Sequence, residues 1–287
     1  MIKSFSTLAL ISLLILSCDK QEATEIAIIE ETPPPNILFV IADDMGKDAT
    51  PNYSEGQEKP QMPTLEMLAN SGITFDNVWA YPVCSPTRAS IITGKLGYHT
   101  GVLEVEQDIS LSEESLHDFV KSQSNGAYDT ALIGKWHLSN NITDPNNMGI
   151  DYFSGIIGGG VSSYTNWKEV TNGSRTDNTS YTTTAFSSSA IDWISNREKP
   201  WFLWLAFNAP HTPFHLAPAN LHQQGSLPSD DASIAANPLP YYFSAIEALD
   251  KELGRVIAAI PNGLENTIVI FLVDNGTPSQ VIQTPYR

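Results

Sequence analysis

Three runs of consecutive apolar residues constrain the fold of this 287-residue chain more than any other feature. They are NILFVIA at residues 36–42, WFLWLAF at residues 201–207 and TIVIFLV at residues 267–273. Strands that are apolar at every position are typical of a parallel sheet with both faces covered. Helical patterns separate the strands, at residues 63–71, 86–93, 112–122, 184–195 and 241–260. This alternation predicts an α/β fold with a mostly parallel (mixed) central sheet and helices on both faces.

Polar side chains follow each predicted strand directly. They are Asp43 and Asp44 after the first run, Lys135 and His137 after a strand expected at residues 129–133, Asn208 and His211 after residues 201–207, and Asp274 and Asn275 after the last run. Ligands of open α/β sheets bind outside the carboxyl ends of the strands. Any one of these groups could be a turn, but four groups at one edge predict a ligand site. The stretch at residues 162–190, rich in Ser, Thr and Asn, is expected to be a solvated loop.

The residue types at this edge suit a cation and an anion together. Asp43, Asp44, Asp274 and Asn275 offer the hard oxygen ligands that Ca²⁺ or Mg²⁺ prefers. Zinc is disfavoured, because histidines are few and no cysteine pair is available. The cations Arg88 and Lys135, with the nearby histidines, suit an anionic group held against that metal. The combination describes a site for a sulfate or phosphate ester.

The chain has only two cysteines, and Cys84 precedes the helix predicted at residues 86–93. A helix N-terminus favours an anion because its N–H groups lack partners. The other cysteine, Cys18, ends an apolar N-terminal segment. If Cys18 carries lipid, Cys84 has no disulfide partner. Cys84 is therefore either an inert core thiol or a chemically used one.

The stretch C-S-P-T-R at residues 84–88 resembles the C-x-P-x-R signature of the type I sulfatases, members of the alkaline phosphatase-like superfamily. G-K-W-H at residues 134–137 matches the second motif of that family, and A-P-H-T-P around His211 is similar to a third. The likeness covers about residues 36–276. It implies that a formylglycine-generating or anaerobic maturation enzyme oxidises Cys84 to formylglycine. It also implies that Ca²⁺, or Mg²⁺, is held by Asp43, Asp44, Asp274, Asn275 and the modified Cys84.

The same resemblance implies a role for each remaining motif residue. Arg88 would hold the hydrated formylglycine, Lys135 would neutralise the sulfate oxygens, and His137 would accept a proton. His211 or a nearby lysine would donate a proton to the leaving alcohol. The implied reaction is hydrolysis of a sulfate ester on a small molecule or glycan. The residues leave two alternatives open: a formylglycine-dependent phosphonate monoester or phosphodiester hydrolase, and a non-catalytic surface lipoprotein that binds sulfated glycans.

The N-terminus resembles a bacterial lipoprotein signal. Lys3 precedes an apolar run at residues 8–16, and Ser17-Cys18 follows it. This predicts a signal peptide at residues 1–18 with lipid on Cys18, and an acidic, Pro-terminated tether at residues 19–35. The expected location is the bacterial cell envelope, on a lipid anchor in the membrane.

Residues 36–287 then form the expected catalytic domain. The family usually continues beyond the region matched here, through a further lysine into a smaller C-terminal subdomain. The chain is therefore expected to be the truncated N-terminal portion of such an enzyme, with an inactive fragment as the alternative to an active one. The net charge of −17 argues against nucleic-acid binding, which needs a basic surface.

Overall fold

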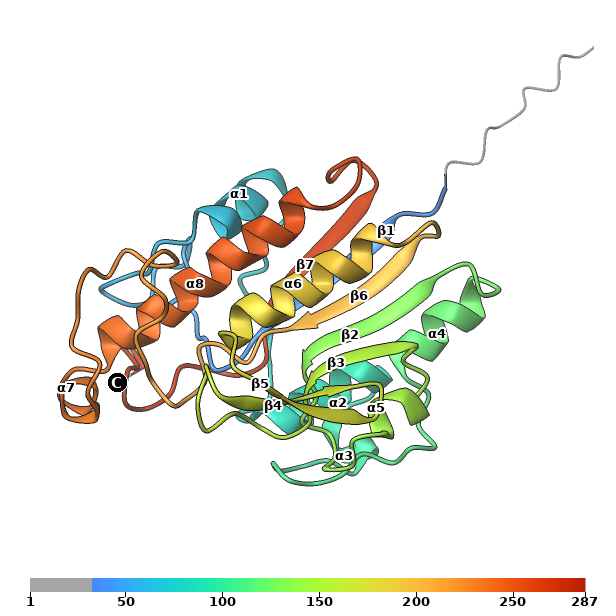
Figure 1. Cartoon of the computed structure of the whole chain (residues 1–287), viewed down its shortest axis with the longest axis horizontal. Coiled ribbons are helices and arrows are strands. Elements are labelled where there is room, and N and C mark those ends of the chain that lie inside the picture. The colour runs from blue at the N-terminus through green and yellow to red at the C-terminus, as the bar shows by residue number, and fades with distance from the viewer. Residues whose placement is uncertain (1–32, 287) are drawn as a thin grey trace, which may run out of the picture. The chain divides into compact units, whose positions relative to one another are not determined.

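The computed structural model describes residues 33–286, which build one mixed sheet with helices on both faces (Figure 1). In these residues the strands run in the order β5-β4-β3-β2-β6-β1-β7. The strands are β1 (Asn36–Ala42), β2 (Asp129–Lys135), β3 (Tyr152–Ile156), β4 (Trp167–Thr171), β5 (Ser174–Asn178), β6 (Trp201–Ala206) and β7 (Thr267–Val273). The helices are α1 (Pro63–Ser71), α2 (Cys84–Thr93), α3 (Gly97–Thr100), α4 (Leu116–Gln123), α5 (Asp144–Asn147), α6 (Thr182–Ser195), α7 (Asp231–Ala236) and α8 (Leu239–Ala258).

The three apolar runs form the adjacent strands β6, β1 and β7, all parallel, as their composition predicted. The α1, α6 and α8 helices cover one face of the sheet, and α2 and α4 cover the other. Side chains alternate between the two cores along β1: Leu38 and Val40 pack into the first, Phe39 and Ile41 into the second. The predicted α/β architecture is confirmed.

The expectation of a solvated loop at residues 162–190 is wrong. Strands β4 and β5 form an antiparallel hairpin there, and β4 pairs with β3. Its turn is Asn172-Gly173, with φ of 45° and 77°, the conformation that two-residue hairpin loops favour. Trp167 and Val170 on β4 are buried in the cores, so this polar stretch still contributes to packing.

Several predicted helix boundaries also differ. The helices α2 and α6 begin two residues earlier than predicted, at Cys84 and Thr182, and α8 lies two residues earlier at both ends. The helix expected from residue 112 begins at Leu116, because the Ser115 side chain accepts a hydrogen bond from the Asp118 N–H at 3.1 Å and caps it.

The predicted signal peptide, the predicted lipidation site Cys18 and most of the predicted tether lie outside the described residues. Within residues 33–286, no helix combines the length and apolar character that a bilayer crossing requires.

His117 gives a stability prediction for the second core. Its ring is fully buried and lies parallel to the Trp204 ring, with 6.0 Å between the ring centroids. Its Nε2 lies 3.2 Å from the Ala131 carbonyl oxygen. Burial lowers the pKa of His117 from 6.5 to about 3. The folded state therefore resists protonation, so this contribution to stability is fully present above pH 6.5 and is lost as the pH falls.

Between pH 7 and pH 5, we expect the wild type to lose about 2 kcal/mol more unfolding free energy than His117→Phe. Urea denaturation at the two pH values measures the difference. An equal loss in both proteins would contradict a neutral, buried His117.

Candidate functional site

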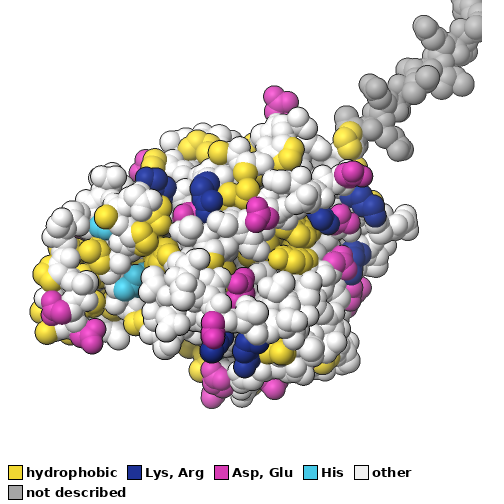
Figure 2. Space-filling view, viewed as in Figure 1, with side chains coloured by type: hydrophobic (Ala, Val, Ile, Leu, Met, Phe, Trp, Pro, Cys, Tyr) yellow, Lys and Arg dark blue, Asp and Glu magenta, His cyan; other side chains and the backbone are white. Residues whose placement is uncertain are grey.

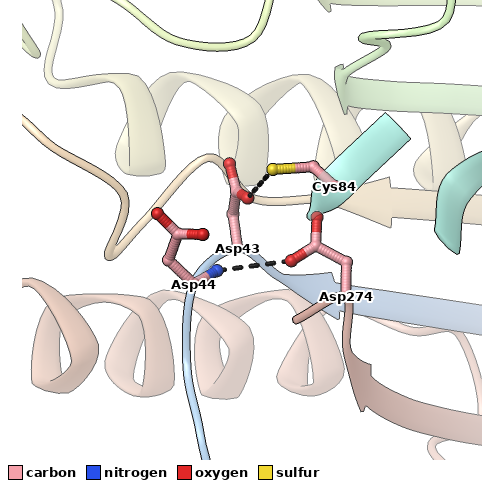
Figure 3. Close-up of side chains that lie close together, drawn as sticks. All are labelled: Asp43, Asp44, Cys84 and Asp274. Atoms are coloured by element: carbon pink, nitrogen blue, oxygen red, sulfur yellow. Dashed lines mark hydrogen bonds between the residues drawn. The ribbon is translucent and has the colours of Figure 1, made fainter. Parts of the chain in front are cut away.

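The carboxyl ends of β1, β2, β6 and β7 meet the start of α2 at one edge of the sheet. Asp43 and Asp44 leave β1, Asp274 leaves β7, and Cys84 opens α2, with their side chains gathered together (Figure 3). One potential ligand atom from each of these four residues lies within 4.8 Å of the others. The strand-end residues that the sequence singled out thus form one cluster.

Asp43 occupies the centre of the cluster and is fully buried. One of its oxygens accepts a hydrogen bond from Lys135 Nζ at 2.5 Å, and the other lies 3.3 Å from Cys84 Sγ. Lys135 Nζ is also 3.3 Å from the same sulfur. Asp43 therefore links the lysine of the G-K-W-H segment to the cysteine of the signature.

Arg88 contacts both Asp274 and the backbone of Lys135. Its Nε and Nη2 lie 2.9 Å and 2.7 Å from Asp274 Oδ2, and its Nη1 donates to the Lys135 carbonyl at 2.9 Å. Arg88, Lys135, Asp43 and Asp274 are all at most 1% exposed. Such buried charges are tolerated only because each has a hydrogen-bonded counter-charge.

Gly134 makes this placement of Lys135 possible. A Cβ on Gly134, whose φ is 116°, would lie 1.8 Å from the Ala206 carbonyl oxygen. Only glycine lets β2 approach β6 so closely in this conformation.

Two non-glycine residues of the site have left-handed backbone conformations, Asp44 with φ of 64° and His137 with φ of 56°. Contacts from other elements hold both: Tyr242 donates to the Asp44 carbonyl, and Ser85 donates to the His137 carbonyl, each at 2.9 Å. Such strain persists where the surrounding structure fixes it, and it concentrates at functional sites.

The donor set fits a hard divalent cation. Three carboxylates converge, and burial, followed by the charge of Asp43, raises the pKa of Asp274. The buried Asn275 Oδ1 has no hydrogen-bond partner among the described residues, while its Nδ2 donates to Asp44. Crowded carboxylates beside an unpartnered amide oxygen are what Ca²⁺ or Mg²⁺ would satisfy.

Cys84 is a protonated thiol in this environment. It is 6% exposed, and burial, reinforced by the Asp43 carboxylate, raises the pKa of its thiol above the ordinary value. A thiolate nucleophile needs the opposite shift. The cysteine as encoded is thus poorly suited to attack a substrate directly.

The two histidines differ in their surroundings. Burial, and then the charges of Lys135 and Arg88, lower the pKa of His137 to about 2, so its ring is neutral near pH 7. Neither His137 ring nitrogen has a hydrogen-bond partner among the described residues. His211 Nδ1 lies 2.8 Å from the Thr212 carbonyl oxygen, which assigns the proton to Nδ1 and leaves Nε2 facing Asp44 at 3.7 Å.

The sequence pattern assigned Tyr164 and Glu106 no place at this site, and it identified Asn208 only as a strand-end residue without a role. Tyr164 lies behind His211, and its hydroxyl lies 2.9 Å and 2.6 Å from the carbonyl oxygens of Asn208 and His211. The Asn208 side chain is 1% exposed, with neither amide atom partnered among the described residues. Glu106 Oε1 lies 3.5 Å from His137 Nε2. Only Asn208 carried a signal, its position directly after a predicted strand.

The fold and the site define an α/β protein that can hold a cation and an anion side by side. The family model for sulfatases matches residues 35–285, and the chain belongs to the sulfatase family. It is 27% identical to the uncharacterized sulfatase YdeN of Escherichia coli over 90% of this chain and 56% of that protein. It is 33% identical to the N-acetylglucosamine-6-O-sulfatase of Bacteroides thetaiotaomicron, over 67% of this chain and 33% of that protein.

Among solved structures, Ps i-CgsB in complex with k-i-k-neocarrahexaose superposes with a TM-score of 0.73 at 24% identity, covering 88% of this chain and 61% of that one. This likeness concerns the fold. The chain spans about half the length, or less, of the curated relatives named above.

Proposed function

We propose that this chain carries the catalytic site of a sulfatase that hydrolyses sulfate esters with a formylglycine made from Cys84. The single observation that carries the proposal is the place of Cys84: at the N-terminus of α2, with its sulfur 3.3 Å from both Asp43 and Lys135. A helix N-terminus and a buried lysine favour negative charge beside that side chain.

The charge of the cluster supports a sulfate ester. Three carboxylates face two buried cations, Arg88 and Lys135, so a bound divalent cation leaves one net positive charge. A sulfate monoester carries one negative charge, whereas a phosphate monoester carries nearly two at neutral pH. A phosphodiester or phosphonate monoester also carries one, so it stays as the second candidate.

In this proposal Asp43, Asp44, Asp274, Asn275 and the modified Cys84 hold Ca²⁺, or Mg²⁺, which would polarise a sulfate oxygen and stabilise developing charge. Oxidation of Cys84 by a maturation enzyme supplies an aldehyde whose hydrate offers an oxygen nucleophile in place of the protonated thiol. Arg88, fixed by Asp274, orients that side chain, and Lys135 neutralises the sulfate oxygens.

The histidines then move the protons. His137, whose ring nitrogens have no hydrogen-bond partner among the described residues, would accept a proton. Its low pKa makes the ring a weak base until an anion bound beside it favours the protonated form. His211 would donate a proton to the leaving alcohol oxygen from Nε2, on the side of Asp44, when the ring is doubly protonated and Nδ1 keeps its proton on the Thr212 carbonyl oxygen.

Relatives supply the proposed substrate class. One relative is an N-acetylglucosamine-6-O-sulfatase. A solved neighbour, 22% identical with a TM-score of 0.66, is described in complex with its substrate D-glucosamine-2-N,6-O-disulfate. We propose that the substrate of this chain is a sulfated glycan. We also propose that the chain acts at the bacterial cell envelope, anchored to a membrane through lipid on Cys18.

Sulfate release by the full chain, co-expressed with a formylglycine-generating enzyme and supplied with Ca²⁺, tests the function. We expect hydrolysis of 4-nitrophenyl sulfate to exceed that of bis(4-nitrophenyl) phosphate. The reverse preference would favour the diesterase. Hydrolysis of neither compound by protein that contains formylglycine would favour a lipoprotein that only binds sulfated glycans.

The segment of residues 158–160 gives a prediction for this reaction. A Cβ on Gly159 would lie 2.6 Å from Cε1 and Nε2 of His137, whereas a Cβ on Gly158 would meet nothing within 4 Å. Gly159→Ala should displace the His137 ring and lower kcat on 4-nitrophenyl sulfate by about 100-fold. Gly158→Ala, the matched control, should keep kcat within about twofold of the wild type. Equal activity of the two variants would contradict the proposed role of His137 as proton acceptor.

A further inference from the structure

A cavity of about 490 Å³ lies beside the candidate site, at the carboxyl end of β3. Its lining includes Gly158, Gly160 and Ser162 on one side and Asn166, Lys168 and Arg175 on the other. A Cβ on Gly160 would lie 3.2 Å from the His211 ring. The segment of residues 158–162 therefore runs beside His211 and also forms one wall of the cavity.

The β4–β5 hairpin brings charged side chains to this cavity. The register pairs Lys168 with Asp177 and Val170 with Arg175, which places these side chains on one side of the hairpin. Figure 2 shows Lys and Arg beside Asp or Glu over the region of the hairpin. Lys168 and Asp177 form an ion pair. The Arg175 side chain is exposed and forms no ion pair or hydrogen bond with the rest of residues 33–286.

The chain has a net charge of −17, with 32 acidic residues against 15 Lys and Arg, so a guanidinium without an acidic partner is a candidate contact for an anionic ligand. Its five N–H groups match the oxygens of a sulfate or carboxylate. The amide of Asn166 and the hydroxyl of Ser162 can add hydrogen bonds to sugar hydroxyls. The lining of the cavity is therefore suited to binding an anionic sugar. Only the segment of residues 158–162 separates the cavity from His211, the proposed proton donor.

A second cavity, of about 850 Å³, has the opposite character. It lies at the start of β2 and β3, and its lining includes Asp129, Asp151, Glu169 and Asp192 against Arg197, which is paired with Asp129 at 3.2 Å. Its negative charge would repel a sulfated glycan, so it is not a rival site for the same ligand.

We propose that the cavity between residues 158–162 and the β4–β5 hairpin is a subsite for a second anionic group of the substrate, a sulfate or carboxylate on the sugar beside the one that loses its sulfate. Arg175 is its ionic contact. The subsite rests on the proposed sulfatase function and adds to it a preference for glycans with more than one negative charge.

The test compares Arg175→Gln with Lys199→Gln in the matured full chain. Lys199 is an exposed cation just before β6, at the opposite edge of the sheet, so its loss changes the net charge equally. The substrates are 4-nitrophenyl sulfate and sulfated disaccharides from heparin, chondroitin sulfate and carrageenan. The best disaccharide is assayed beside its derivative that keeps only the cleaved sulfate and carries no carboxylate.

We expect Arg175→Gln to lower kcat/KM on the multiply charged disaccharide about tenfold, chiefly through KM. Hydrolysis of 4-nitrophenyl sulfate and of the singly charged disaccharide should not change, and Lys199→Gln should match the wild type. Titration of the multiply charged disaccharide into the Cys84→Ala protein, with and without Arg175→Gln, should show the same loss of affinity without turnover.

Three outcomes overturn the subsite: an unchanged kcat/KM for Arg175→Gln, an equal loss on the singly charged disaccharide, and hydrolysis of 4-nitrophenyl sulfate without hydrolysis of any disaccharide. A matured wild type that fails on 4-nitrophenyl sulfate as well would instead contradict the proposed function, and the subsite with it.

Discussion

Cys84→Ala should abolish sulfate release from 4-nitrophenyl sulfate, lowering kcat/KM by about 10⁴-fold or more, because the variant cannot form the oxygen nucleophile. Relative to the unmodified protein, the change removes a single buried sulfur atom, so the unfolding free energy should fall by only about 1 kcal/mol. Activity assays paired with urea denaturation separate the two effects.

A Cys84→Ala protein that is stable and still active would show that Cys84 is an inert core thiol. A protein that is inactive because it is unfolded would show a lost urea transition. The Ca²⁺ affinity of the folded variant, measured by calorimetry, reports whether the carboxylates are still in place.

Asp274→Ala should remove both activity and much of the stability. Arg88 is fully buried, with its Nε and Nη2 on one Asp274 oxygen at 2.9 Å and 2.7 Å. Loss of the carboxylate leaves an uncompensated buried guanidinium, which should lower the unfolding free energy by about 3–5 kcal/mol. Urea denaturation without added metal measures this loss.

The double variant Asp274→Leu/Arg88→Met separates the structural effect from the chemical one. It removes both charges and keeps apolar volume, so it should recover most of the lost stability while staying inactive and binding Ca²⁺ weakly. A double variant no more stable than Asp274→Ala would show that the unpaired Arg88 is not the cause of the destabilisation.

The sequence predicted those elements whose pattern is local. The runs at β1 and β7 were assigned with their observed bounds, because strands buried in a parallel sheet need apolar residues at every position. The β4–β5 hairpin was missed because β5 is exposed and polar, so periodicity carries no signal there. The dipeptide Asn172-Gly173 was the available signal, since it favours a two-residue hairpin turn.

The convergence of Asp43, Asp44 and Asp274 was predictable from the sequence, because strand-end residues of a parallel sheet meet at one edge. The geometry of the site was not. The left-handed backbone of His137 and the contact of Gly159 with its ring depend on how β2 approaches β6 and where the loop after β3 runs. Both features depend on tertiary packing, so no local sequence pattern predicts them.

The mass of the tryptic peptide of residues 48–88 tests the central claim most directly. Trypsin cuts after Lys47 and Arg88 and spares the Lys59-Pro60 bond, so this peptide contains Cys84. In protein from its native host, the peptide should be lighter by the difference between a CH₂SH side chain and an aldehyde, and it should resist thiol alkylation. A full-mass peptide that alkylates at Cys84 would contradict formylglycine-dependent sulfate ester hydrolysis by this chain.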